Sequence, residues 1–415
     1  STLLPVLGYT LISAGLLATI LTVGSAHRRI SQRQAYMEQA AYVAEGGAEQ
    51  GARYVEANLG SIGSSFVTNG TLGSGAFTYT ITKSNSTTYS LTATGFVNSV
   101  QRHVSIKRIY QPTYAQYSLW SHENGVIYFV AGEVFDGRVH ADDMLYFSGN
   151  PVFHAEVSSA ASSYGGSISS VTFDKGLVLN DAQGTMADVD FNSAASTSLK
   201  NVASSSGLVL DGNTTITMNG GTISITNSRQ GWTNRSYTAS AEGIIYIRDA
   251  TTGSSSTRPG TAYLTGGQVT GRMTIATESK MYIQGNITYT TDPVAHPSST
   301  DALGLISRDD VYVDTMAPNN LTVDAAIIAA GTAGSGNRGN FSVVNYNTGS
   351  PRGNLNIYGG IVQDQRGAVG TTSGGSIVTG FSKHYSYDPR FIDTPPPYYP
   401  AVSGKLQYSN WQEGN

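Results

Sequence analysis

The side chains best suited to acid–base chemistry in this sequence are two pairs of adjacent aspartates, Asp142–Asp143 and Asp309–Asp310, together with His140. Adjacent residues of a strand point to opposite faces, so neither pair by itself places two carboxylates around one bond, as glycoside hydrolysis requires. His140 and Asp142 share a face of the expected strand, where the imidazole could serve as a ligand or a base. A hydrogen-bonded pair at the surface is the more common role. We therefore expect these aspartates at solvated corners of the fold.

Motifs for metals and cofactors give no stronger signal. Asp301, Asp309 and Asp314 carry the oxygen ligands that Ca²⁺ prefers, but their spacing follows no calcium-binding pattern. The chain has no cysteine, which excludes disulfides and thiolate metal sites. It also lacks an HExxH motif, a phosphate-binding loop and a nucleophile elbow. We assign no catalytic, cofactor-binding or metal-binding residue and expect that the protein is not an enzyme and has no cofactor.

Composition points to a β-rich protein that works outside the cell. The 415 residues include 24 basic and 28 acidic side chains, so no strong electrostatic field would recruit nucleic acid. The 48 glycines and 25 tyrosines, with abundant Ser, Thr and Asn, are typical of an extracellular β protein. We expect no nucleic-acid partner.

Short strands dominate the sequence after residue 59. Residues 60–116 contain three alternating segments, 77–83, 89–97 and 102–110, and we expect a small β meander packed on the preceding helix. Residues 117–390 contain many brief apolar segments separated by Gly, Asn, Asp and Ser, which favours a β-solenoid over a β-sandwich. Residues 391–415 form a tail rich in Pro and aromatic residues, which we expect to cap the solenoid end, with Pro395–Pro397 extended.

The N-terminal segment is the apolar part of the chain: residues 1–26 contain no charged side chain. As a helix this segment would be roughly 39 Å long, enough to cross a bilayer. The helical pattern continues to residue 59, so the chain is expected to have an α+β fold, a long helix followed by a mainly-β body. The apolar residues of the first segment that would pack in a helix bundle are Leu3, Leu4, Pro5, Val6, Leu7, Leu11, Ile12, Leu16, Leu17, Ile20, Leu21 and Val23.

This arrangement resembles a type IV pilin or pilin-like protein. The match is carried by the apolar helix, by the amphipathic half with Ala44-Glu45-Gly46-Gly47, and by the Gly/Ser/Thr-rich β region behind it. The resemblance implies that a prepilin peptidase removes a basic leader and that the apolar helices form a filament core. It also implies a processed start at Ser1. Gly8-Tyr9-Thr10-Leu11-Ile12-Ser13 is similar to the family's cleavage motif and offers a second register.

One departure from the family concerns its usual glutamate at the fifth mature position. This chain has Pro5 there, or Ser13 in the second register, and its first acid is Glu38. Registration of neighbouring subunits by a glutamate at that position is therefore in doubt. A plain signal anchor is the alternative interpretation of residues 1–60, since hydropathy does not separate anchors from pilins.

The sequence thus predicts a structural subunit of a type IV pilus-like extracellular filament that polymerises through its apolar helix. Its expected partners are further copies of itself in a helical filament, the cytoplasmic membrane before assembly, and the pilus assembly machinery. Its expected location is the cell surface, with the cytoplasmic membrane as the site before assembly. Two alternatives stay open: a minor pilin or pseudopilin of a pilus or secretion machine, and a membrane-anchored β-helix enzyme acting on polysaccharide.

Overall fold

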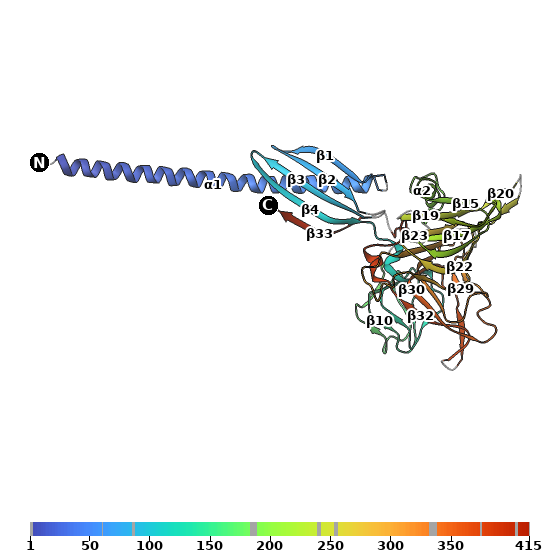
Figure 1. Cartoon of the computed structure of the whole chain (residues 1–415). Helices are drawn as coiled ribbons and strands as arrows, with labels where there is room; N and C mark the ends of the chain where they lie inside the picture. The colour runs from blue at the N-terminus through green and yellow to red at the C-terminus, as the bar shows by residue number, and fades with distance from the viewer. Residues whose placement is uncertain are drawn as a thin grey trace. The chain divides into compact units, whose positions relative to one another are not determined.

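The computed structural model describes residues 3–59, 61–84, 88–182, 189–238, 242–252, 256–331, 338–373, 376–402 and 406–414. The chain divides into two compact units (Figure 1), one made of residues 1–110 and 406–415 and the other of residues 111–405. The first unit therefore contains both ends of the chain. The boundary between the two units lies a few residues before the expected domain boundary at 116/117. The last ten residues were expected to belong to the C-terminal tail, but they belong to the first unit.

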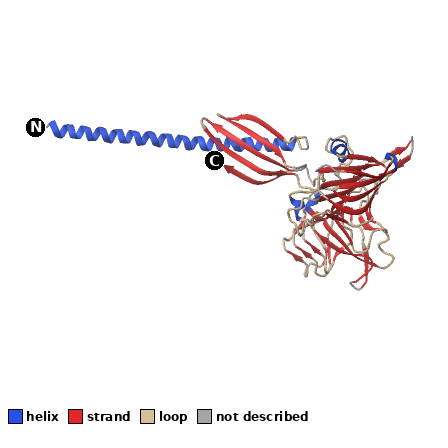
Figure 2. Ribbon diagram, viewed as in Figure 1, coloured by secondary structure: helices blue, strands red, loops and turns tan. Residues whose placement is uncertain are grey.

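A single helix, α1 (Leu3–Ala57), forms the N-terminal part of the first unit, as the sequence predicts (Figure 2). Pro5 sits in its first turn, where a missing amide hydrogen costs no intrahelical bond. Only the second half of α1 has a buried face, and the spacing of that face by three and four residues matches the helical period. The buried residues are Ala40, Val43, Ala44, Gly47, Ala48, Gly51, Ala52 and Val55.

The second half of α1 packs on an antiparallel sheet with the order β1-β2-β3-β4-β33. Alternating residues of β2, including Phe77, Tyr79 and Ile81, are buried toward the helix. Small residues let the two layers approach closely: a Cβ on Gly95 would lie 2.2 Å from the carbonyl oxygen of Ala40. The strands are β1 (Ser65–Leu72), β2 (Gly75–Lys83), β3 (Thr88–Val97), β4 (Val100–Tyr110) and β33 (Gln407–Gly414).

Strand β33 corrects the expected course of the tail. It pairs antiparallel with β4, and the side chain of Tyr110 donates a 2.6 Å hydrogen bond to Gln407. The end of the chain therefore covers the otherwise free edge of β4 in the first unit, where its amides and carbonyls gain partners.

The second unit is built around one parallel sheet with the strand order β15-β19-β23-β26-β28-β30-β5-β8-β11-β14. The strands β15 to β30 form one side of this sheet and the strands β5 to β14 the other. The two sides meet where Ile361 of β30 pairs with Leu119 of β5. Its strands are β5 (Tyr117–Glu123), β8 (Arg138–Ala141), β11 (Val157–Ser159), β14 (Leu177–Leu179), β15 (Leu208–Asp211), β19 (Glu242–Arg248), β23 (Arg272–Thr277), β26 (Ala302–Ser307), β28 (Leu321–Ala329) and β30 (Pro351–Gln365).

Further parallel sets enclose the core with this sheet. β7, β10 and β13 pair in parallel, as do β6, β9 and β12, and β22 runs parallel to β16, β24 and β25. Their bounds are β6 (Tyr128–Phe129), β7 (Val134–Phe135), β9 (Tyr146–Phe147), β10 (Val152–Phe153), β12 (Gly165–Gly166), β13 (Thr172–Phe173), β16 (Thr214–Gly220), β22 (Ala262–Val269), β24 (Met281–Ile283), β25 (Ile287–Tyr289), β27 (Val311–Val313) and β29 (Phe341–Val343).

Antiparallel strands and short helices complete the unit. They are β17 (Thr222–Asn227), β18 (Trp232–Tyr237), β20 (Ala250–Thr252), β21 (Ser256–Arg258), β31 (Gly370–Ser373), β32 (Ser376–Ser386), α2 (Leu199–Ser206), and the 3₁₀ helices η1 (Tyr114–Gln116), η3 (Ser228–Gln230) and η4 (Pro389–Ile392). β32 is antiparallel to β31 and also pairs in parallel with β30. The mainly-β body predicted from the sequence is confirmed. The β-solenoid stays a prediction, because the paired strands also connect into a closed ring, which a simple solenoid does not require.

Stacked side chains in equivalent positions of successive strands fill the core. Phe135, Phe153 and Phe173 lie one above the other, with ring centroids 5.3 and 5.4 Å apart and interplanar angles of 10°. Leu119 faces this core, whereas its neighbour Trp120 belongs to a second cluster on the opposite face of the sheet. Both faces of the parallel sheet are therefore covered, as its apolar composition requires.

The remainder of the expected tail lies on that opposite face and does not cap an end of the stack. Phe391, Tyr399 and Val402 are buried in the same cluster as Trp120. The three prolines do not run straight, since the amide of Tyr399 donates a hydrogen bond to the carbonyl of Pro396 at 3.3 Å and closes a turn. The rings of Phe391 and Tyr399 bury their apolar area on this face.

Candidate functional site

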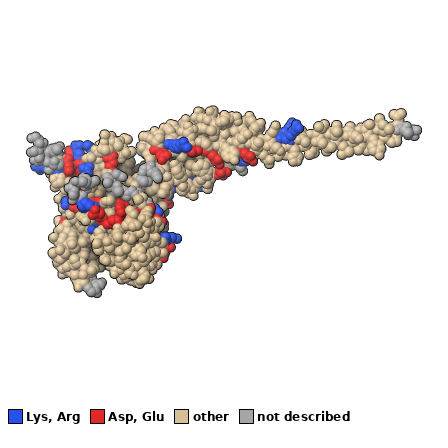
Figure 3. Space-filling view, turned by 180° about the vertical axis from the view of Figure 1, so that it is seen from behind, with Lys and Arg blue, Asp and Glu red and all other residues tan. Residues whose placement is uncertain are grey.

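The first half of α1 presents a long run of exposed apolar side chains. Every residue of the expected bundle set is exposed, with Leu3 81%, Leu16 59% and Leu21 66% accessible. In the space-filling view this part of the helix is free of charge up to a basic patch (Figure 3). Soluble monomers rarely expose so large an apolar patch, so this surface requires a membrane or other protein chains around it.

Polar groups within this segment are satisfied by the helix itself. The hydroxyls of Thr10, Ser13 and Thr19 donate to the carbonyls four residues earlier, at 3.1, 2.7 and 2.8 Å. Thr22 also donates to the carbonyl of Ala18. A helix whose Ser and Thr hydroxyls bond its own carbonyls can enter lipid or a dry helix bundle with few unpaired donors.

Small residues interrupt the apolar surface at Gly8, Gly15 and Gly24. A Cβ placed on any of the three would meet no atom within 4 Å, so the positions are open to a neighbour. Small residues on apolar helices let two backbones approach closely, which strengthens packing between helices when lipid offers no hydrophobic gain.

Within the described residues, α1 is the helix that is long and apolar enough to cross a membrane. Such a helix at the N-terminal end, continued by an amphipathic half that packs on a sheet, is typical of type IV pilins. The N-terminal helix of this chain thus resembles that of a pilin. Ser1, the expected processing site, lies outside the described residues, so the pilin-like description rests on α1.

The comparisons with known proteins add little to this. A family model described as "Domain of unknown function (DUF4900)" matches residues 78–162. No curated protein matches the chain. The crystal structure of the competence-associated pilin ComZ from Thermus thermophilus is similar at 13% identity, covering 91% of this chain and 97% of that chain, with a TM-score of 0.35.

The residues first considered for acid–base chemistry form a network on the parallel sheet. His140 hydrogen-bonds through Nε2 to Asp142 at 3.0 Å and through Nδ1 to Ser158 at 2.7 Å, and His122 contacts the other oxygen of Asp142 at 2.9 Å. The expectation of a surface pair was wrong for His140, which is 0% exposed because the ring of Trp120 covers it at 4.4 Å between ring centroids.

Ser158, which the sequence analysis missed, completes a Ser–His–Asp series. The arrangement resembles the order of a nucleophilic triad, but the Ser158 hydroxyl is bound to the imidazole in a position only 3% exposed. A substrate could reach this hydroxyl only if the side chains packed on this face of the sheet moved away. The pairing of β5, β8 and β11 in register explains why these residues meet, so the network joins adjacent strands.

The remaining carboxylates have protein partners. Asp143 accepts hydrogen bonds from the amides of Asn124 and Gly125 at 2.9 and 3.3 Å, while burial raises the pKa of its carboxyl. The ammonium group of Lys280 lies 3.9 Å from Asp309 and 2.9 Å from Asp310. These carboxylates therefore stabilise turns and adjacent strands.

The three aspartates considered for calcium are also separately engaged. Asp301 accepts from the amides of Gly271 and Thr291 at 2.7 and 2.9 Å, and Asp314 accepts from the side chain of Gln284 at 2.9 Å. In the part of the chain that the structure describes, no three His, Cys, Asp or Glu residues are grouped so as to hold a metal.

Proposed function

We propose that this chain is a structural subunit of a type IV pilus-like extracellular filament, in which α1 helices bundle in the core and the β units lie outside. The observation that carries the proposal is the exposed apolar half of α1, in which the hydroxyls of Thr10, Ser13 and Thr19 bond carbonyls of the helix itself. Residues 3–26 would hold the subunit in the cytoplasmic membrane before assembly. Extraction by the pilus assembly machinery would then replace lipid contacts with helix contacts.

The body in this proposal is a β-solenoid that serves as the outer surface of the filament. Parallel strands that recur along residues 117–179, such as β5, β8, β11 and β14 in one sheet, support this interpretation. Internal stacking of this kind stabilises a body without disulfides, which the chain lacks.

A minor pilin or pseudopilin would use the same helix and is the second candidate. The polysaccharide-enzyme alternative is weaker, because the carboxylates that could act in it are bound to amides, a lysine and histidines. The two filament roles differ in copy number, which the amount of this chain in purified filaments measures.

The decisive variant is Leu16→Asp, because a charge in a dry helix bundle costs several kcal/mol of desolvation. We expect filaments to be lost when assembly is scored by electron microscopy of sheared cell-surface material. Val294→Asp is the matched control: Val294 lies in the other unit and is 71% exposed, compared with 59% for Leu16. Normal filaments from Leu16→Asp subunits would refute the core assignment.

A further inference from the structure

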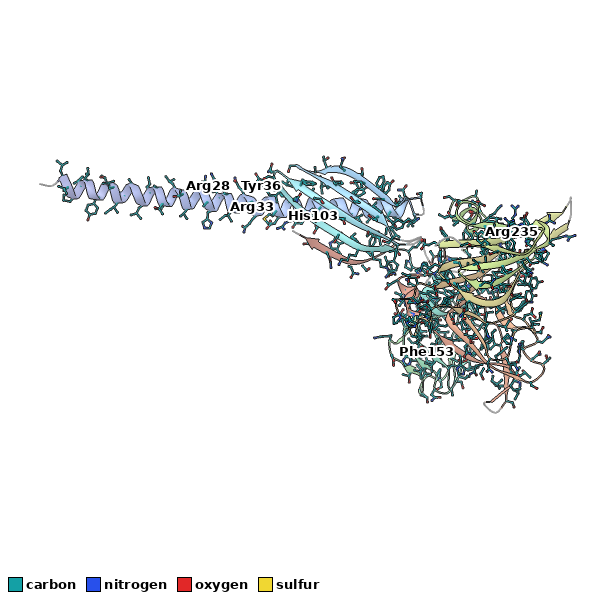
Figure 4. All side chains as sticks on the ribbon, in the orientation of Figure 1. Arg28, Arg33, Tyr36, His103, Phe153 and Arg235 are labelled. Carbon is teal, nitrogen blue, oxygen red and sulfur yellow. The ribbon has the colours of Figure 1, made fainter. Side chains whose placement is uncertain are left out.

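Directly after the apolar segment, α1 carries a cluster of cations without counter-ions. Arg28, Arg29 and Arg33 are exposed, and Arg28 and Arg33 project from the bare helix in Figure 4. Among the described residues no ion pair involves them, and the first acid of the chain is Glu38. Arg29 and Arg33 are also four residues apart on the helix, where like charges repel. This basic segment, residues 28–33, is therefore unfavourable without a partner.

The first unit also contains a groove suited to cations. Its volume is about 680 Å³, and it runs between α1, the end of β1 at Leu72, and β33. Three aromatic side chains line it and remain exposed: Tyr42 at 68%, Tyr408 at 46% and Trp411 at 48%. Glu45, Glu49 and Arg53 lie on its α1 side, so its charged lining has two carboxylates and one guanidinium group.

Aromatic faces and carboxylates together form the usual environment for a guanidinium group. Glu49 has one partner, Arg53 at 2.6 Å, but the two side chains are 66% and 75% exposed, so the pair is weak and can be shared. Glu45 makes no ion pair among the described residues. The groove thus offers two carboxylates and three aromatic rings to an incoming cation.

We propose that this groove binds the basic segment of a second copy of the chain. The inference rests on the proposed function, because a filament brings many copies of α1 side by side. Charge complementarity selects the occupant: the basic segment carries three exposed arginines, and the groove has three aromatic rings and two carboxylates, of which Glu45 has no arginine partner among the described residues. No carboxylate precedes Glu38, so charges within residues 1–26 cannot set the register between neighbouring helices.

The contact would fix how far neighbouring subunits are shifted along the filament axis. About sixteen residues separate the centre of the basic segment from the centre of the groove on α1, which at 1.5 Å per residue is about 25 Å. Two copies in contact through the groove would therefore be offset axially by about 25 Å.

The test is charge reversal with compensation. Arg28→Glu/Arg29→Glu places acids against the groove, and Glu45→Arg/Glu49→Arg/Arg53→Glu reverses the groove while keeping the intrahelical pair. Each variant should lower filament yield by about tenfold or more, and their combination in one chain should restore it to within about twofold. Arg235→Glu, an exposed change in the other unit (Figure 4), should have no effect. Melting of each variant as extracted monomer shows whether the subunit still folds.

Normal assembly of both single-sided variants would overturn the inference and leave the proposed function intact, since filaments would still form. Loss of assembly that the combined variant does not repair would also overturn it, and would assign the arginines to anionic lipid head groups. The proposed function itself fails separately, through normal filaments from Leu16→Asp.

Discussion

Asp324 is a half-buried carboxylate of the second unit whose burial has an electrostatic cost. Its side chain accepts a 3.0 Å hydrogen bond from the amide of Tyr289, and burial raises the pKa of its carboxyl to about 6. The folded chain therefore binds this proton more tightly than the unfolded chain. Its contribution to stability is present below the unfolded pKa of about 3.9 and is lost as the pH rises through about 6.

Asp324→Asn should accordingly stabilise the body by about 1 kcal/mol at pH 7.5 and give no gain at pH 4. The amide oxygen of Asn can still accept from Tyr289, so the hydrogen bond is kept. Asp211→Asn is the opposite case, because the hydrogen bond from Arg248 lowers the pKa of Asp211, and it should destabilise at neutral pH. Denaturant unfolding at both pH values measures the two effects; an equal change for Asp324→Asn at both values would contradict the assignment.

Pro5 offers a second prediction for a single residue. It lies in the first turn of α1, where proline is tolerated, and its side chain is exposed like the rest of the apolar segment. Pro5→Glu would introduce a charge into the proposed bundle, so we expect a lower filament yield by electron microscopy. Improved assembly would instead show that the missing acid is a defect of this chain.

Residue-level prediction from the sequence was limited by contacts between distant strands. His140 and Asp142 could be paired from their spacing, but the burial of His140 depends on Trp120 and the bond to Ser158 depends on strand register. Neither follows from spacing within one strand. Asp142 and Asp143 do have different partners, but they lie in a bend after β8 and not in a strand, so strand alternation is not the reason.

At the scale of elements, α1 and the small sheet depend on close approach of their backbones. A Cβ on Gly95 would lie 2.2 Å from the Ala40 carbonyl oxygen and 2.4 Å from the Ala44 nitrogen, and neither backbone atom can move without shifting the helix. Gly95→Ala should therefore destabilise the first unit by about 2 kcal/mol. Gly63→Ala, where a Cβ would meet nothing within 4 Å, should change stability by less than about 0.5 kcal/mol.

Thermal unfolding of the two glycine variants measures this difference. Equal melting temperatures for Gly95→Ala and Gly63→Ala would show that the helix–sheet contact adjusts without cost. A loss of thermal stability in Gly95→Ala alone would show that β3 contacts α1 tightly at Ala40 and Ala44.

Elements with strong periodicity were predictable, whereas polar or very short ones were not. The expected segments 77–83, 89–97 and 102–110 coincide within two residues with β2, β3 and β4. β1 and β33 were missed because their sequences, SFVTNGTL and QYSNWQEG, show little alternation and bury little. Both are edge strands, whose place is decided by the free edges of β2 and β4.

At the scale of the whole molecule, the sequence predicts a long helix and a mainly-β body, and the structure has both. It does not predict that β30 and β5, more than 200 residues apart, are neighbours in one sheet, because that pairing joins distant strands with similar apolar patterns. The same reasoning explains why the tail was misplaced: its aromatic content predicts burial but not the surface that buries it.

The central claim is that many copies of this chain assemble through the apolar half of α1. A helical reconstruction of purified filaments by electron cryomicroscopy tests it most directly. The account predicts residues 3–26 as bundled helices along the filament axis, with the β units outside and contacting helices offset by about 25 Å. Filaments held together by the β units with the apolar helices away from the axis, or a chain found only as separate membrane-anchored copies, would contradict it.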